Sequence, residues 1–344
     1  MNGQILVFED RDESFADLEK GFIKEGKPKL LKHYIPKKEG RVKPEDLDRL
    51  FVPKAPIGLV VLDQDLSLYK GAYVSSAEVK ESCLRMGMPL CVYATKNEDY
   101  KVKEYMAWSE AQIALDSRDS MDGLAKKCLI IFQGFSELRS AFDKARGRKK
   151  DAPSVLQKVL KAPTAASAQI QQYAWGERQI LARVKNRIHS RYMATMAGYW
   201  IFNVLLRFPG VMLNEIAAAS YLGILPVSFA ENSVRRLFAR AEYSGPFAGL
   251  GQFWWAAELD SLISGLAGNR DSRGLTYARK NGLKVSKARC IEGKHLGAGY
   301  YCIITGEPVC LRHSDSPSGW LPLGADRSRI SQSKYRQLSP WLGI

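Results

Sequence analysis

The sequence predicts an α/β N-terminal domain with a parallel sheet, then a mainly α-helical domain, then a small β-rich module that contains Cys and His. Three observations predict this organisation. Short apolar runs alternate with helical patterns over residues 1–145. Aromatic residues are frequent over 171–273, and Gly, Ser and Pro become frequent over 274–344. A linker is expected at 146–170, which begins with the basic sequence RGRKKDAP.

The elements of the first domain follow from its hydrophobic pattern. Apolar runs bounded by polar residues are typical of buried strands, and they occur at 4–8, 57–67, 89–95 and 112–117. Apolar residues at helical spacing predict helices at 15–23, 76–86 and 121–145. The Lys- and Pro-rich stretch 27–56 is expected to be largely loop.

Beyond the linker the pattern is mostly helical up to about residue 265, and 299–311 (GYYCIITGEPVCL) predicts a hairpin with TGEP at its turn. The adjacent Trp254 and Trp255 are interpreted as core residues, because neighbouring side chains cannot both face the same way to stack on bases.

Charge is the most informative bulk property. The chain has 344 residues, with 51 basic and 36 acidic side chains. Residues 1–150 hold 27 basic and 24 acidic side chains, a net of +3, and residues 151–344 hold 24 and 12, a net of +12. Such a surplus favours a polyanionic partner, of which nucleic acid is the usual one. The alternative is surface charge that serves solubility alone.

Composition excludes several classes of protein. A chain that is 46% hydrophobic and 25% charged is neither mainly disordered nor collagenous. No apolar stretch reaches the roughly 18 residues of a membrane span, and the first residues do not resemble a secretory signal, so we expect a cytoplasmic protein without membrane contact. The six Cys residues then favour free thiols or metal ligands over disulfides.

Acidic residues follow two of the expected strands. Glu9 and Asp10 come directly after 4–8, and Asp63 and Asp65 end the apolar run that starts at residue 57. The carboxyl ends of parallel strands meet at one edge of a sheet, so we expect these side chains to lie close together. Mg²⁺ held by Glu9, Asp10 and Asp63 would offset their repulsion. The alternative is that the acids only solvate the strand ends.

This pattern resembles a response-regulator receiver domain over about the first 120 residues. LVFEDRDE resembles the first strand with its acidic pair, VVLDQDLS resembles the strand that presents the phospho-accepting aspartate, here Asp63, and GMPLCVYAT resembles the strand that ends in Ser or Thr, here Thr95. Ser117 and Arg118 stand where that family has a lysine, and Lys96 follows Thr95 directly. The resemblance therefore implies a degenerate receiver that binds a protein partner.

The same acids resemble a second family. Toprim domains carry a Glu after the first strand and Asp-x-Asp after a later one, which Glu9, Asp63 and Asp65 match. This resemblance implies a Mg²⁺-dependent nuclease or topoisomerase-type enzyme with these three catalytic residues.

The basic helical region resembles a helix-turn-helix. Asn214 is expected to start a helix and Gly223 to provide the tight turn after it. The following helix, expected over 228–245, carries Arg235, Arg236 and Arg240, which would contact phosphates or guanine edges. A preceding helix at about 193–207 would complete a three-helix core. The alternative is a purely structural helical core.

A second basic patch precedes this region and would contact phosphates. It contains Arg183, Lys185, Arg187 and Arg191, and Arg183 and Arg187 are spaced to share a helix face.

Cysteine and histidine gather near the C-terminus. Cys310 and His313 form a close pair, and a hairpin would bring Cys290 and Cys302 together, with His295 as a fifth candidate ligand. Four such ligands suit Zn²⁺. The alternative is a β-rich module in which these thiols fill apolar space.

The leading interpretation is a non-enzymatic nucleic-acid-binding protein, with DNA favoured over RNA, that acts as a regulator or as a subunit of a nucleoprotein complex. The alternatives are the toprim-like enzyme and an RNA-binding effector subunit.

Overall fold

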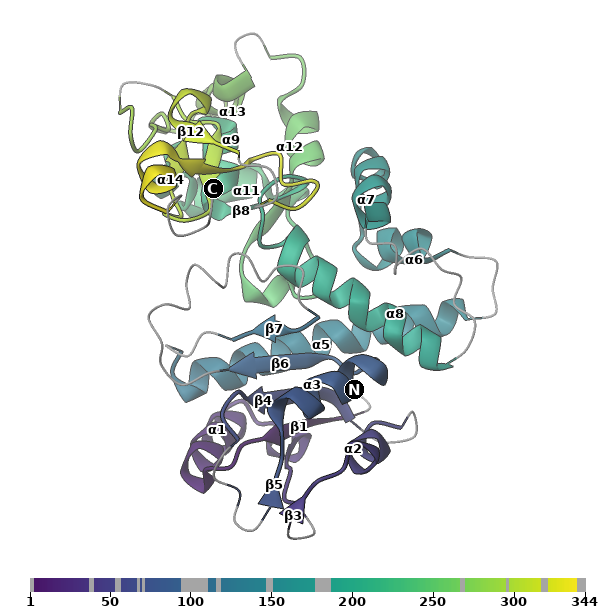
Figure 1. Cartoon of the computed structure of the whole chain (residues 1–344). Helices are drawn as coiled ribbons and strands as arrows, with labels where there is room; N and C mark the ends of the chain where they lie inside the picture. Colours follow the sequence, from purple (N-terminus) through teal and green to yellow (C-terminus); the bar gives the residue numbers. More distant parts are fainter. Residues whose placement is uncertain are drawn as a thin grey trace. The chain divides into compact units, whose positions relative to one another are not determined.

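The computed structural model (Figure 1) describes residues 3–36, 40–52, 57–66, 69, 72–93, 111–115, 119–146, 151–176, 187–266, 270–294, 297–316 and 321–338. The chain divides into two compact units. Unit 1 contains residues 1–160, 177–202 and 245–250, and unit 2 contains 161–176, 203–244 and 251–344. Following the chain from end to end therefore means crossing between the units five times.

Unit 1 contains the predicted parallel sheet. Its strands are β1 (Gln4–Phe8), β2 (Leu31–His33), β4 (Ile57–Asp63), β6 (Leu90–Tyr93) and β7 (Ile113–Ala114), in the order β2-β1-β4-β6-β7. All neighbouring pairs are parallel. Counted along the chain, this is the doubly wound order 2-1-3-4-5, which reverses direction between β1 and β4. The predicted α/β fold class is confirmed.

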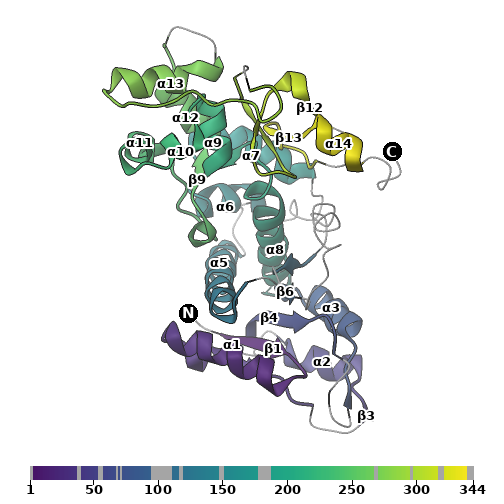
Figure 2. The ribbon, with the colours of Figure 1, turned by 90° about the vertical axis from the view of Figure 1, so that its left-hand side faces the viewer.

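Helices cover both faces of this sheet. Helices α2 (Pro44–Leu50) and α3 (Ser76–Arg85) share an apolar core with alternate residues of the strands, among them Leu6 and Val60. Helices α1 (Asp12–Lys24) and α5 (Met121–Ala145) pack together so closely that a Cβ on Gly21 would lie 2.8 Å from the Ala125 Cβ. Because both faces are covered, every residue of β4 and β6 except Gly58 is buried, as their continuous apolar sequences predicted. Figure 2 shows the same unit from a second direction.

The stretch 27–56, which was expected to be largely loop, contains two strands, a helix and a 3-10 turn among its described residues. Strand β2 pairs with β1, and α2 packs on α3. The remaining short elements of unit 1 are the 3-10 turns η1 (Pro28–Leu30) and η5 (Ala248–Leu250), and the paired strands β3 (Gly40–Arg41) and β5 (Ala72–Tyr73).

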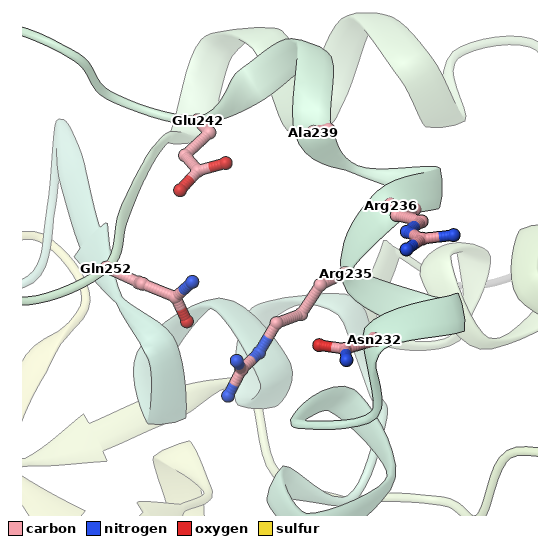
Figure 3. A pocket seen from close by; sticks show the side chains of 6 residues that line it. All are labelled: Asn232, Arg235, Arg236, Ala239, Glu242 and Gln252. Carbon is pink, nitrogen blue, oxygen red and sulfur yellow. The ribbon is translucent and has the colours of Figure 1, made fainter.

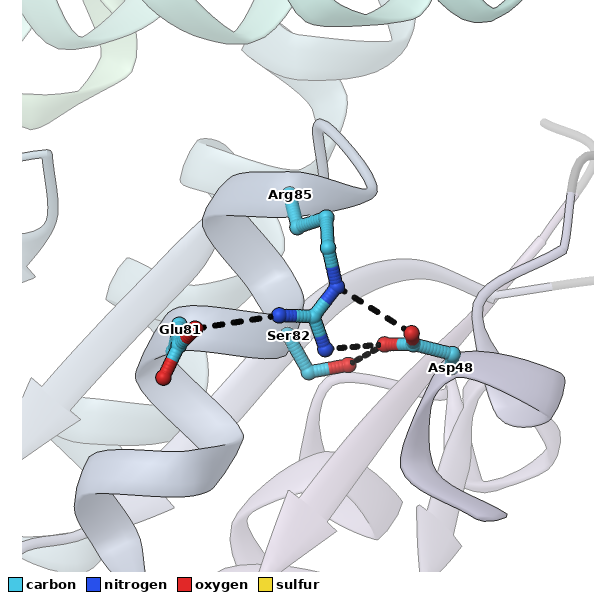
Figure 4. A network of polar contacts seen from close by, with 4 residues as sticks. All are labelled: Asp48, Glu81, Ser82 and Arg85. Carbon is cyan, nitrogen blue, oxygen red and sulfur yellow. Dashed lines mark hydrogen bonds and ion pairs between the residues drawn. The ribbon is translucent and has the colours of Figure 1, made fainter. Parts of the chain in front are cut away.

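A polar network joins α2 to α3 (Figure 4). Asp48 accepts hydrogen bonds from Arg85 Nη2 at 2.9 Å and Nε at 3.1 Å, and also from the Ser82 hydroxyl. Arg85 reaches Glu81 at 3.2 Å as well. Burial of Asp48 opposes ionisation, but the hydrogen bonds from Arg85 and Ser82 outweigh it and hold the pKa of Asp48 below its ordinary value. The network fixes the two helices on one face of the sheet.

Helix α8 (Arg187–Trp200) belongs to unit 1, where it packs against α5. The Tyr199 hydroxyl accepts a hydrogen bond from Leu90 N at 2.8 Å, and Thr195 Oγ1 donates to Gly87 O at 2.8 Å. These bonds tie α8 to the start of β6. The helix continues into a π-helical turn, η3 (Ile201–Leu205), and the two cover most of the helix expected at about 193–207. Residues 187–202 belong to unit 1, whereas the helix that starts after Asn214 belongs to unit 2.

The expected linker at 146–170 is also helical. It contains α6 (Ala152–Val159) and the start of α7 (Thr164–Gly176). Asp151 caps α6, because its side chain accepts a hydrogen bond from Ser154 N at 2.9 Å.

Unit 2 is built around α9 (Glu215–Leu222). The Asn214 side chain caps the helix by accepting from Ala217 N at 2.9 Å, and Gly223 ends it in the left-handed conformation with φ of 71°, both as predicted. Strands β8 (Met212–Asn214) and β9 (Phe253–Trp255) pair antiparallel beside it, and α12 (Ala256–Ile263) and α13 (Arg270–Lys280) complete the helical part. Trp254 and Trp255 are both buried, which confirms their assignment to the core.

The C-terminal part of unit 2 is a four-stranded mixed sheet. Its order is β11-β10-β13-β12, and it is followed by a helix. The predicted hairpin is confirmed, because β10 and β11 pair antiparallel. The elements are β10 (Tyr300–Cys302), β11 (Pro308–Val309), η6 (Leu311–His313), β12 (Ser314–Asp315), β13 (Ser328–Ser331) and α14 (Gln332–Leu338).

The helix expected over 228–245 is interrupted. Instead the chain forms α10 (Pro226–Phe229), α11 (Asn232–Leu237) and a 3-10 turn, η4 (Ala239–Ala241). The rings of Phe229 and Phe238 lie 5.8 Å apart. Nine residues of continuous helix would separate them by about 13.5 Å along the axis, so the break lets both rings enter one core.

Candidate functional site

The acidic residues of unit 1 meet at the point where the strand order reverses. Glu9, Asp10 and Asp63 each place a carboxylate oxygen within 4.8 Å of the other two, and Glu9 and Asp63 are buried. The Arg11 backbone N–H donates to Glu9 Oε1 at 2.9 Å, and the Tyr93 hydroxyl donates to Glu9 Oε2. These three carboxylates can hold a metal ion, and their oxygen donors suit a hard cation.

Burial raises the pKa of Asp63 to about 6. The hydrogen bond from Asp65 N to Asp63 Oδ1, at 3.1 Å, opposes this rise, and the charges of Glu9 and Asp10 add to it. Near neutral pH the cluster therefore carries repulsion that a bound cation would relieve.

The cluster contains one of the two sets of acids that the sequence suggested. Asp65 is exposed and lies outside the group that Glu9, Asp10 and Asp63 form. The structure thus brings together Glu9, Asp10 and Asp63, the acids of the receiver resemblance. It does not bring Asp65 of the toprim resemblance into the same group. Thr95, Lys96, Ser117 and Arg118 lie outside the described residues.

Replacing Asp63 with Asn should stabilise unit 1 in the absence of divalent cations. The folded pKa of about 6 lies above the ordinary 3.8, so ionisation of Asp63 destabilises the folded state progressively as the pH rises through this interval. We expect D63N to raise the free energy of unfolding by about 2 to 3 kcal/mol above pH 7, and by little below pH 4. Hydrogen exchange of the amides in β4 and β6 measures this change in stability. Replacement of the exposed Asp65 with Asn is the matched control. If the amides of D63N exchange as fast as those of the wild type at pH 7.5, the expectation is wrong.

Two of the predicted thiol ligands and a histidine come together in unit 2. Cys290 Sγ lies 4.0 Å from His313 Nδ1, and Cys310 Sγ lies 3.4 Å from the same atom. The Cys310 backbone N–H donates to Cys290 Sγ at 3.3 Å. Cys290 and Cys310 are buried, and His313 is half-buried. Two sulfurs and an imidazole nitrogen in a small apolar setting can hold a metal ion.

Cys302 does not join this group, although the sequence suggested it as a fourth ligand. It packs beside Cys290 and Cys310, but its sulfur accepts a hydrogen bond from Ser331 N at 3.3 Å, at the end of β13, and lies outside the group of ligand atoms. His295 lies outside the described residues. The described residues thus supply three ligands rather than the predicted four.

The predicted arginines of the helical region have different environments. Arg235 pairs with Glu215 of α9 and is half-buried, whereas Arg236 is exposed. Arg240 is 71% exposed and lies 3.4 Å from Glu258. Arg235 and Arg240 are therefore each paired with a carboxylate, and the side chains of Arg236 and Arg240 are exposed.

A hollow of about 250 Å³ lies beside these arginines (Figure 3). Arg235 and Asn232 extend toward it from α11, and Glu242 and Gln252 lie on its opposite side, while Arg236 points away. Because Glu242 faces this space, the hollow alone does not define a site for a phosphate.

The second basic patch is only partly described. Arg191 is buried, and its guanidinium Nη1 donates to Phe51 O at 2.6 Å. Within unit 1 it holds α8 on the residue that follows α2, so its assignment to a nucleic-acid surface is wrong. Arg187 is the first residue of α8, and its side chain, like Arg183 and Lys185, lies outside what the structure describes.

The structure points to a cationic stretch that the sequence reasoning missed. We call residues 279–289 (RKNGLKVSKAR) the basic strip; no acidic residue occurs from 272 to 291. Its five cationic side chains are exposed, and among the described residues none of Lys280, Lys284, Lys287 and Arg289 has a carboxylate partner. The signal in the sequence was this run of residues without acids. A count of charges over all of 151–344 does not reveal it.

The basic strip lies next to the predicted turn of the helical region. Leu225 N donates to Ser286 O at 2.8 Å, and Ala288 N donates to Gly223 O at 3.0 Å. The rings of Phe238 and Tyr277, 5.8 Å apart, bring the end of α11 against α13, which leads into the strip. The exposed cations of the basic strip and the exposed Arg236 of α11 thus belong to adjoining elements.

The chain matches no protein-family model and no curated protein sequence. Among the described residues, no helix combines the length and the apolar character needed to cross a membrane.

Proposed function

We propose that this chain is a non-enzymatic nucleic-acid-binding protein, a regulator or a subunit of a nucleoprotein complex, and that unit 2 makes the contact. The observation that carries the proposal is the basic strip, in which Lys280, Lys284, Lys287 and Arg289 are exposed and have no carboxylate partner within the part of the chain that the structure describes. Phosphates are the partner that offsets such a row of charge, with release of bound counterions.

DNA is favoured over RNA because Arg236 and Arg240 extend the strip onto α11 and η4, and a short exposed helical element fits the major groove. An RNA-binding subunit is the alternative.

Salt titration of the full chain tests the proposal. Binding to a labelled duplex of about 20 base pairs, and to single-stranded and hairpin RNA, is measured between about 0.05 and 0.3 M NaCl. We expect the logarithm of the affinity to fall linearly with the logarithm of the salt concentration, with a slope of about −3 or steeper. Undetectable binding at the lowest salt, or a slope near zero, would contradict the proposal; tighter binding of RNA would make the chain an RNA-binding subunit.

For unit 1 we propose a receiver-like module that binds Mg²⁺ through Glu9, Asp10 and Asp63 and binds a protein partner. Support comes from the strand order and from the three converging carboxylates. The bound ion would supply positive charge that neutralises the buried acids, and Tyr93 and the Arg11 backbone N–H orient Glu9.

Calorimetric titration with Mg²⁺ distinguishes this module from the toprim-like enzyme. We expect Mg²⁺ to bind at pH 7.5 and to bind more weakly below pH 6, as Asp63 takes up a proton. The D63N variant should lose Mg²⁺ binding, and the D65N variant should keep it. Equal loss of binding in D65N, together with Mg²⁺-dependent cleavage of DNA by the wild-type chain, would instead favour the enzyme.

We further propose that Zn²⁺ is the metal that Cys290, Cys310 and His313 hold, because thiolates and imidazole select zinc over hard cations. Elemental analysis of the purified full chain should find close to one equivalent of zinc, and less than about half an equivalent would contradict this assignment.

A further inference from the structure

The basic strip runs directly into the Cys/His group, since Arg289 is followed by Cys290. We propose that metal bound by Cys290, Cys310 and His313 fixes the course of the basic strip, so that metal loading sets the affinity of the chain for nucleic acid. This inference rests on the proposed function, and it adds to it a means by which the binding surface is controlled.

The upstream part of the strip is held by the backbone of its neighbours. Ser286 O and Ala288 N bond to Leu225 N and Gly223 O at the end of α9. Val285 and Ala288 are buried, while Lys284, Lys287 and Arg289 are exposed. The strip therefore presents its cations only as long as its apolar residues stay in place.

The downstream part depends on Cys290. Its sulfur accepts from Cys310 N, and Ile291 N donates to Pro308 O at 3.0 Å. The thiol of Cys290 and the ring of His313, 4.0 Å apart, are too distant for a strong direct bond. A metal ion bonded to Cys290, Cys310 and His313 would replace these weak contacts with coordinate bonds and lock the end of the strip to the hairpin.

Besides the hydrogen bond of Ile291, an isolated backbone bridge between Arg289 and Gly297 restrains this end of the strip. If Cys290 is released, the flanking cations sample many conformations, and nucleic acid must order them on binding at a cost in affinity. A bound metal would order these residues before nucleic acid binds. It contributes through position, without contacting the polymer.

The test compares the zinc-loaded full chain with the same protein after removal of zinc by a chelator, and again after addition of Zn²⁺ alone. Hydrogen exchange at the amides of Ala288, Ile291 and Cys310 reports the order of the strip, and the labelled duplex reports binding. We expect about tenfold faster exchange and about tenfold weaker binding without zinc, both restored by Zn²⁺. Cys310→Ser should behave like the stripped protein, and Cys302→Ser, outside the ligand group, should behave like the loaded one.

Two outcomes would overturn the inference and leave the proposed function intact: equal duplex affinity with and without zinc, or unchanged exchange of these amides despite loss of the metal. Absence of duplex binding in both forms would instead remove the proposed function. Because stripping and reloading use the wild-type chain, the test does not depend on whether Cys310→Ser folds.

Discussion

Replacing Lys284, Lys287 and Arg289 with glutamine should weaken binding of a DNA duplex by about 30-fold or more near 0.1 M salt. Each cation that neutralises a phosphate contributes about 0.9 to the slope of affinity against salt on logarithmic axes, so the slope should become shallower by up to about three. The three side chains are exposed and lack carboxylate partners among the described residues, so their replacement breaks no ion pair within the fold.

A control with the same change in net charge is available in unit 1. Lys27, Lys29 and Lys32 are also exposed, and their replacement with glutamine should change the affinity by less than about threefold. If both triple variants lose affinity equally, the whole charge of the chain is responsible and the basic strip is not the contact surface. Hydrogen exchange of Val285 and Ala288 verifies that the strip keeps its conformation in the variant.

Replacing Gly210 with Ala should destabilise unit 2 by about 3 to 5 kcal/mol. A Cβ on Gly210 would lie 1.7 Å from Gly324 O and 3.0 Å from the Ala325 Cα, and both contacts are with backbone. Neither partner can rotate away. The Ser328 hydroxyl and the Arg327 N–H both donate to Pro209 O, at 2.9 and 3.0 Å, so the two segments are hydrogen-bonded to each other next to the clash.

Urea unfolding followed by tryptophan fluorescence measures this effect, because Trp254 and Trp255 are buried in unit 2. Gly251→Ala is the matched control, since its nearest neighbour would be the Phe253 ring at 3.4 Å, an ordinary contact, and it should cost less than about 1 kcal/mol. A Gly210→Ala protein as stable as this control would mean that residues 210 and 324 do not approach each other as closely as described.

The parallel sheet could be predicted because each central strand is buried on both faces and therefore reads as a continuous apolar run. β2 was missed for the opposite reason. Leu31–His33 is short, lies among Lys and Pro residues, and becomes a strand through its pairing with β1, which the local sequence does not reveal.

The helix expected over 228–245 failed because local propensity competed with packing. No Gly or Pro interrupts residues 228–243, so the pattern favours one helix. The helix is broken instead, and the break lets Phe229 and Phe238 share a core with Trp254. Such a trade depends on residues that are distant in sequence, and it is invisible in a single window.

The candidate sites show the same limits. Cys310 and His313 are close in sequence, so their pairing could be predicted, and convergence of Glu9 with Asp63 followed from strand order. Whether Cys302 or Cys290 faces the pair depends on the registry of β10 with β13, which the sequence leaves open. Likewise, the burial of Arg191 follows from the packing of α8 within unit 1 and from no property of its neighbours in sequence.

The interleaving of the two units along the chain limits how this protein can be divided or recombined. A fragment that ends at residue 160 contains the whole parallel sheet but lacks α8. Tyr199 and Thr195 of α8 bond to the backbone just before and at the start of β6, and Arg191 bonds to the residue after α2. No single cleavage or gene fusion point delivers either unit whole. We therefore expect that neither unit can be produced as a single continuous fragment of this chain.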